Sequence, residues 1–165
     1  MVKPTFIETN EFTWPFQEIV NTYGIPNYKE VNPAVFAAVS FPFLFGIMFG
    51  DIFHGTMLFV FASYLCLSEI KEGSSLFLFG KLRYLFLLMG FFSTFCGFLY
   101  NDFTSIPLEL FGKSCYQVVG ERGTSEAFVE FKELDCVYPI GFDPMWYQAK
   151  NELTYVNSFK MKMSV

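Results

Sequence analysis

Two residues in the most apolar part of the sequence could do chemistry together. Asp51 and His54 are the only Asp, Glu, Lys, Arg or His residues between Pro33 and Ser68, and they lie three positions apart. If the backbone there is helical, both side chains lie on one face, where a carboxylate and an imidazole could pass a proton or hold water. The alternative is structural: Asp51 caps the helix that follows, and His54 sits at the membrane interface. The sequence leaves both interpretations open.

A third acidic candidate, Asp102, follows Asn101 at the end of the next long apolar run. One interpretation places Asp102 on a proton path. The simpler account of both residues is solvation at a membrane surface, where a polar pair ends an apolar segment.

Other kinds of site are not indicated. A metal centre is not expected, because the chain has one histidine and its four cysteines, Cys66, Cys96, Cys115 and Cys136, include no Cys-x-x-Cys pair. The sequence contains no glycine-rich phosphate loop, no Gly-x-Ser-x-Gly motif and no Ser/His/Asp or Cys/His set. We therefore predict neither an autonomous enzyme nor a bound cofactor.

The composition indicates that lipid surrounds the elements that position these residues. Of 165 residues, 53% are hydrophobic, only 16% are charged, and 24 are Phe. The apolar residues form long tracts between Pro33 and Asp102, whereas helices of soluble proteins interrupt such tracts to keep one face polar. No basic patch with interleaved aromatic residues is present, so a nucleic-acid partner is not expected.

The apolar tracts predict three membrane spans. One straight helix over 33–68 would be about 54 Å long, whereas the hydrocarbon layer is about 30 Å thick. We therefore predict a transmembrane hairpin over 33–69, with helices over 33–50 and 55–69 and a tight reversal at Gly50–Gly55. A third transmembrane helix is predicted over 84–102, which makes the fold class an all-α membrane protein. Small residues that could allow close helix contact are Gly46, Gly50, Gly90 and Gly97.

Residues 1–32 are predicted to form a juxtamembrane interfacial segment. A short helix there should end at Gly24-Ile25-Pro26. Its aromatic residues Trp14, Phe16 and Tyr23 suit the headgroup layer, and packing against another domain is an equally good account of them.

The basic residues predict the orientation in the membrane. Lys71, Lys81 and Arg83 cluster in the connection 70–83, whereas the Gly50–Gly55 turn has no Lys or Arg. By the positive-inside rule, the amino-terminal side and residues 70–83 are cytoplasmic. The segment after the third span is then a lumenal loop.

The predicted lumenal loop covers 103–158 and contains Cys115 and Cys136. In an oxidising lumen these cysteines are expected to form a disulfide that closes a loop of about 20 residues and stabilises it by about 3 kcal/mol. Two free thiols are the alternative. Residues 159–165 are expected to begin a fourth span that is cut off.

Several stretches match the pattern of a known family. They are Tyr23-Gly24-Ile25 with Val31-Asn32-Pro33-Ala34; Phe41-Pro42-Phe43-Leu44-Phe45-Gly46-Ile47-Met48-Phe49-Gly50-Asp51; Arg83-Tyr84 with Leu87-Leu88-Met89-Gly90 and Tyr100-Asn101-Asp102; Gly141-Phe142-Asp143-Pro144-Met145-Trp146; and Asn157-Ser158-Phe159-Lys160-Met161-Lys162-Met163-Ser164. In this order they resemble the a subunit of vacuolar-type proton ATPases, the 116 kDa subunit family. The chain departs from the pattern at Phe53, where the family usually has glycine, and at Phe103, where many members have cysteine.

The resemblance implies a fragment of the membrane-embedded stator subunit a of the V0 sector. It implies a part in ATP-driven proton translocation and organelle acidification at vacuolar or other endomembranes, with ATP hydrolysis on other subunits. The implied partners are the proteolipid c-ring, the other V0 and V1 subunits, and membrane lipid. The family's large cytoplasmic domain, its later spans and its essential arginine are not among these residues, and the alternative is a structural or assembly module without transport activity of its own.

Overall fold

The structure is a computed structural model that describes residues 5–68, 76–104, 106–119, 128–132 and 135–145. Its helices are α1 (Trp14–Tyr23), α2 (Ala34–Met48), α3 (Ile52–Leu67), α4 (Phe77–Lys81) and α5 (Arg83–Tyr100). Its strands are β1 (Asp102–Phe103), β2 (Ile106–Pro107), β3 (Tyr116–Val119) and β4 (Phe128–Phe131), which pair as two antiparallel two-stranded sheets.

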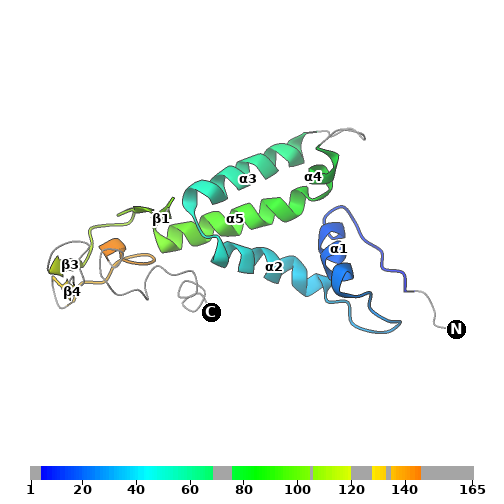
Figure 1. The fold of residues 1–165 in the computed structure, drawn as a ribbon, viewed down its shortest axis with the longest axis horizontal. Coiled ribbons are helices and arrows are strands. Elements are labelled where there is room, and N and C mark those ends of the chain that lie inside the picture. The colour runs from blue at the N-terminus through cyan, green and yellow to red at the C-terminus, as the bar shows by residue number, and fades with distance from the viewer. Residues whose placement is uncertain (1–4, 69–75, 105, 120–127, 133–134, 146–165) are drawn as a thin grey trace.

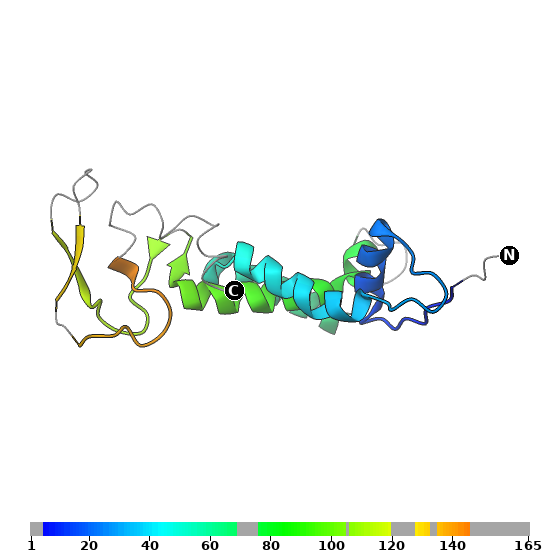
Figure 2. The ribbon, with the colours of Figure 1, turned by 90° about the horizontal axis from the view of Figure 1, so that it is seen from below.

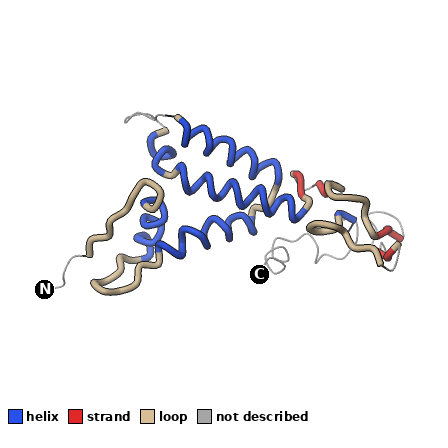
Figure 3. Tube along the Cα trace, turned by 180° about the vertical axis from the view of Figure 1, so that it is seen from behind, coloured by secondary structure: helices blue, strands red, loops and turns tan. Residues whose placement is uncertain are grey.

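Helix α5 is the centre of an elongated bundle (Figure 1). It packs against both α3 and α2, whereas α2 and α3 have few contacts with each other. Helices α1 and α4 lie at the amino end of α5, and the strands lie beyond its carboxyl end, as the edge-on view also shows (Figure 2). The prediction of a mainly helical chain is confirmed. The described part of segment 103–158 adds two small β-hairpins that the all-α prediction did not include (Figure 3).

The reversal between α2 and α3 is tighter than the sequence predicted. Helix α2 ends at Met48 and α3 begins at Ile52, so the connection is Phe49–Asp51, and His54 and Gly55 belong to α3. The predicted turn at Gly50–Gly55 was therefore wrong in its second half. The physical reason is the cap: the Asp51 carboxylate accepts the Phe53 amide at 2.8 Å and starts the helix at once.

The bundle depends on glycines at its helix crossings. A Cβ at Gly90 would lie 2.6 Å from the Phe59 amide nitrogen, and a Cβ at Gly97 would lie 2.4 Å from that of Ile52. Such distances leave no room for a side chain, so the α3 and α5 backbones are in direct contact. Gly46 of α2 approaches the backbone of Phe92 almost as closely, which confirms the predicted role of Gly46, Gly90 and Gly97. Gly55, assigned to the turn by the sequence, does the same against α5. Gly50 lies in the connection after α2, and a Cβ there would lie 2.5 Å from the Tyr100 ring.

Few large side chains are buried, and many apolar ones face outward. The fully enclosed residues include Phe16, Ile47 and Tyr100, whereas Val35 of α2 is 72% exposed and Val60 of α3 is 61% exposed. Phe16 packs with Leu85 and Met89 of α5, so this chain itself encloses its ring, and the interfacial position of residues 1–32 stays a prediction. Helix α1 ends at Tyr23 with Gly24 as its C-cap, so the predicted stop at Gly24-Ile25-Pro26 is confirmed.

One described helix, α5, is long and apolar enough to cross a membrane by itself. Its 18 residues correspond to about 27 Å, and the apolar helices α2 and α3 have 15 and 16 residues. Several predictions fall outside the described residues: those on Lys71, on Trp146 and on the fourth-span segment 159–165.

Candidate functional site

The Asp51 carboxylate joins three groups from two segments. One of its oxygens, Oδ1, accepts the amides of Phe53 at 2.8 Å and Thr104 at 3.2 Å, and Oδ2 lies 2.7 Å from Nδ1 of His54. The Asp51 side chain is 17% exposed and the His54 side chain is 62% exposed. The carboxylate thus caps α3 and also holds the turn between β1 and β2, while the imidazole remains open to the outside.

Asn101 and Asp102 are buried at the carboxyl end of α5, with 0% and 5% exposure. The expectation that both are simply solvated was therefore wrong. Asn101 ends the helix in the left-handed conformation, at φ 51°, and its side-chain amide donates to the carbonyl of Phe142 at 2.7 Å. Because asparagine tolerates this backbone conformation, one residue both ends the helix and binds a distant loop.

The loop bound by Asn101 covers the end of α5. The amide of Phe142 donates to the carbonyl of Leu99 at 2.9 Å, and the Phe142 ring packs on Tyr100 with centroids 5.9 Å apart. Gly141 has a φ of 78°, and a Cβ there would lie 2.1 Å from the Leu99 carbonyl oxygen. The motif that begins at Gly141 is therefore a docking element whose glycine is required by both space and backbone conformation.

Two polar side chains of α5 satisfy the open carbonyls at the end of α2. Ser93 Oγ donates to the Phe49 carbonyl at 2.6 Å, and the Tyr100 hydroxyl donates to the Ile47 carbonyl at 3.1 Å. Helix ends leave such carbonyls without intrahelical partners, and lipid offers none. Sequence reasoning missed both residues, although a serine and a terminal tyrosine in an uncharged apolar run were a usable signal.

The segment beyond α5 is organised around a buried carboxylate and a disulfide. Cys115 and Cys136 are bonded in the structure, with Cα atoms 5.5 Å apart and a sequence separation of 21. Asp143, 5% exposed, accepts the amides of Cys115 at 2.9 Å and Met145 at 3.0 Å and also the Ser114 hydroxyl. Asp143 was not among the predicted site residues, although it lies within the motif that starts at Gly141.

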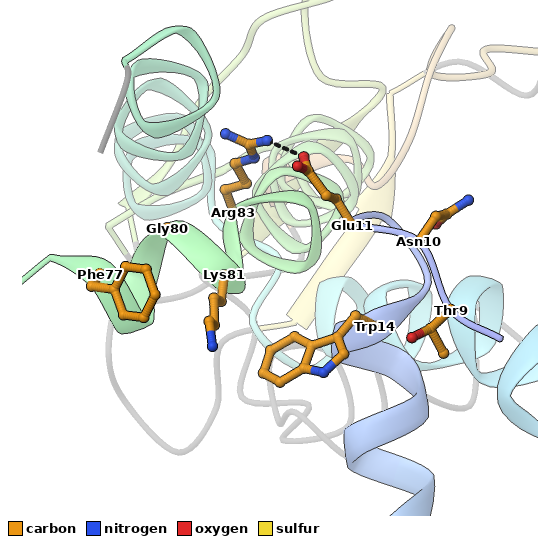
Figure 4. A pocket seen from close by; sticks show the side chains of 8 residues that line it. All are labelled: Thr9, Asn10, Glu11, Trp14, Phe77, Gly80, Lys81 and Arg83. Carbon is orange, nitrogen blue, oxygen red and sulfur yellow. Dashed lines mark hydrogen bonds and ion pairs between the residues drawn. The ribbon is translucent and has the colours of Figure 1, made fainter. Parts of the chain in front are cut away.

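The opposite end of α5 carries a pocket of about 450 Å³ (Figure 4). There Arg83 forms an ion pair with Glu11, and the Lys81 ammonium lies over the rings of Phe77 and Trp14, with centroid distances of 4.8 and 5.4 Å. We call it the Lys81 pocket. Its lining residues are Thr9, Asn10, Glu11, Trp14, Phe77, Gly80, Lys81 and Arg83.

The predicted site residues thus lie in two neighbouring regions of the structure. Asp51, His54 and Asp102 gather at the carboxyl end of α5, and the cysteine pair lies in the segment that follows it. Within the described residues, no group of three or more His, Cys, Asp or Glu side chains could hold a metal ion.

Comparison with known proteins gives a family match along the chain. The V-type ATPase 116kDa subunit family matches residues 1–165. The "Vacuolar proton translocating ATPase 100 kDa subunit" of Dictyostelium discoideum is 48% identical over 167 residues, covering 98% of this chain and 20% of that protein. "V-type proton ATPase subunit a1" of Arabidopsis thaliana is 45% identical with the same coverage, and the human "V-type proton ATPase 116 kDa subunit a 2" is 42% identical over 98% of this chain and 22% of its own length. The chain spans about a fifth of the length of these relatives.

Proposed function

Because the chain belongs to the V-type ATPase 116 kDa subunit family, we propose that it forms three membrane spans of the stator subunit a in the V0 sector of a proton-transporting ATPase. The family is a membrane-sector subunit and not the one that hydrolyses ATP. In this proposal the chain takes part in ATP-driven proton translocation and organelle acidification as a component of the assembled pump.

The observation that carries the three-span proposal is the distribution of polar and apolar groups in the bundle. The open carbonyls of Ile47 and Phe49 are satisfied from inside by α5, while large side chains such as Val35 and Val60 face outward. Buried carbonyls need partners in either solvent, and a hydrocarbon layer supplies none to any that are left open. Many outward-facing apolar side chains are unfavourable as a continuous patch in water and are favourable against lipid.

The proposed orientation follows the charges. The Lys81 pocket and residues 1–32 and 70–83 face the cytoplasm, the hairpin 33–69 and the helix 84–102 cross the bilayer, and 103–158 lies in the lumen. The lumenal position suits a segment that contains the Cys115–Cys136 disulfide. The proposed partners are the proteolipid c-ring, the other V0 and V1 subunits and membrane lipid, in a vacuolar or other endomembrane.

Within the pump we assign this bundle a supporting role. The Asp51 carboxylate already accepts two amides and contacts His54, so it acts as a cap that joins α3 to the β1–β2 turn. Proteoliposomes containing this chain alone should therefore show no proton flux above that of empty liposomes, measured with a pH-sensitive dye. A measurable flux would assign conduction to these spans and remove the supporting role.

Glycosylation mapping tests whether the chain crosses the membrane an odd number of times, and in which direction. Val137, 84% exposed, lies in the proposed lumenal segment, and Val137→Asn together with Pro139→Ser creates an acceptor site there. Expressed in endoplasmic-reticulum membranes, this variant should gain one glycan that a glycosidase removes. The same acceptor sequence fused before Met1 should stay unmodified. Glycans at both places, or at the amino terminus alone, would contradict the proposal.

A further inference from the structure

We propose that the Lys81 pocket binds the phosphate of an anionic phospholipid, with Lys81 as its principal cation. The pocket is lined from the segment before α1, from α4 and from Arg83 at the amino end of α5, whereas the Asp51 and Asn101 contacts lie at its carboxyl end. The inference rests on the proposed function in one respect, because the cytoplasmic leaflet is the one that carries the anionic lipids.

The pocket carries a net positive charge, and one of its two cations can bind an anion. Lys81 forms no ion pair with another described residue, and its ammonium is held between the rings of Phe77 and Trp14 (Figure 4). Arg83 is paired with Glu11, so these three charged residues leave a net charge of about +1. Aromatic rings orient an ammonium without neutralising it, and a phosphate can therefore approach the same group from the open side.

The surroundings favour a lipid over a soluble anion. At the start of α4 and within it, the helix that also contributes Phe77, Gly80 and Lys81 to the pocket, Leu76, Leu78 and Phe79 are 40%, 62% and 43% exposed. A free phosphate would use the cation and leave these side chains in water. A phospholipid places its phosphate at Lys81 and its acyl chains along the apolar side chains, which is how basic and aromatic residues meet the membrane interface.

Tryptophan quenching by brominated lipid tests the site. The sequence has two tryptophans, so Trp146→Phe leaves Trp14 as the reporter inside the pocket. The full chain is placed in two matched series of phosphatidylcholine nanodiscs, one with increasing fractions of brominated phosphatidylserine and one with the same fractions of brominated phosphatidylcholine. One lysine at an anionic surface corresponds to about a fivefold preference, so the serine lipid should quench Trp14 at about one fifth of the concentration. Equal quenching by the two lipids would overturn the proposal.

Matched variants separate the pocket from the surface as a whole. Lys81→Gln should abolish the preference, Lys81→Arg should keep it, and Lys29→Gln, at an exposed lysine outside the pocket, should leave it unchanged. If Lys29→Gln reduces the preference as much as Lys81→Gln does, the effect belongs to general surface charge and the proposal fails. Relief of quenching by millimolar inorganic phosphate would instead assign the site to soluble anions and overturn the choice of a lipid.

A second reporter distinguishes failure of this inference from failure of the proposed function. Phe91 is 51% exposed in α5, so Phe91→Trp with Trp14→Phe and Trp146→Phe reports whether the helix lies in lipid. Strong quenching at position 91 by brominated phosphatidylcholine, together with no lipid preference at Trp14, rejects the pocket alone. No quenching at position 91 rejects the membrane span, and with it both proposals.

Discussion

The two ends of α5 are built from different interactions. At the carboxyl end, Asn101 is fully buried and binds the loop at Phe142, and Asp51 is 17% exposed and binds amides from two segments. At the amino end, Arg83 is 24% exposed and its partner Glu11 is 77% exposed. Buried hydrogen bonds to backbone groups fix one geometry, whereas exposed charges exchange partners with little change in free energy. One end of α5 is therefore a fixed clasp, and the other is an adaptable surface.

The largest loss of stability is expected from a bulky side chain where α3 crosses α5, near the fixed end. Gly97→Leu would force a side chain into the space occupied by the backbone of Ile52, and we expect a loss of about 3 kcal/mol or more, at the upper end of overpacking effects. Stability is measured as the temperature above which the chain in detergent is no longer monodisperse. Gly24→Leu is the control, because no atom lies within 4 Å of a Cβ there. Equal stability of the two variants would contradict the close contact between α3 and α5.

Removing the disulfide tests the segment beyond the clasp. Cys115→Ser should destabilise that segment by about 3 kcal/mol, the loop-entropy value for a crosslink of this separation. Because the bond does not cross the helix bundle, α5 should keep its own stability, and hydrogen exchange should increase in the segment from Ser114 to Asp143, which includes the strands β3 and β4. In the unchanged protein, maleimide should label Cys115 and Cys136 only after reduction. Labelling of both without reductant would show free thiols.

Asn101 contributes to stability through its left-handed backbone conformation and through its hydrogen bond to Phe142, and two substitutions separate these contributions. Asn101→Gly keeps the left-handed backbone conformation and loses the bond to Phe142, so it should cost about 1–2 kcal/mol; Asn101→Ala also loses the conformation and should cost about 1 kcal/mol more. Both values come from denaturant unfolding of the chain in mixed micelles. If the alanine variant is no less stable than the glycine variant, the backbone conformation contributes nothing.

The sequence predicted the helices better than the contacts that fix their ends. Uncharged runs and glycines are local signals, so the three apolar helices and the close approach at Gly90 and Gly97 could be found without a structure. The bond from Asn101 to Phe142 joins positions 41 apart, and no local pattern reveals such a pair. A polar residue at the end of an apolar run suggests solvent, and its burial depends on a loop whose position only the fold determines.

The absence of a local signal for long-range contacts also limited the prediction of the candidate site. Asp51 and His54 were found together because their spacing is local, and the structure brings them to 2.7 Å. The third partner of Asp51, the Thr104 amide, comes from another segment, so the sequence could not show that the carboxylate joins two parts of the chain.

The capping and the proton-path interpretations of Asp51 predict different results for one substitution. Asn retains the capping oxygen, so under the capping role Asp51→Asn should cost less than about 0.5 kcal/mol, whereas Asp51→Ala should cost about 1 kcal/mol. In the assembled ATPase, Asp51→Asn should then pump protons at the normal rate. A stable Asp51→Asn complex that hydrolyses ATP without acidifying vesicles would assign Asp51 to the proton path.

The smallest effect is expected at the adaptable end. Glu11→Gln removes the partner of Arg83, and an ion pair this exposed contributes about 0.2–1 kcal/mol, so the unfolding temperature should hardly move. The change nevertheless raises the charge of the Lys81 pocket by one, because Arg83 no longer faces a carboxylate. The preference of Trp14 for brominated phosphatidylserine should therefore increase in Glu11→Gln and not in Glu8→Gln, which lies outside the pocket. A large loss of stability without any gain in lipid preference would mean that this end is also a fixed clasp, and the contrast between the two ends of α5 would be lost.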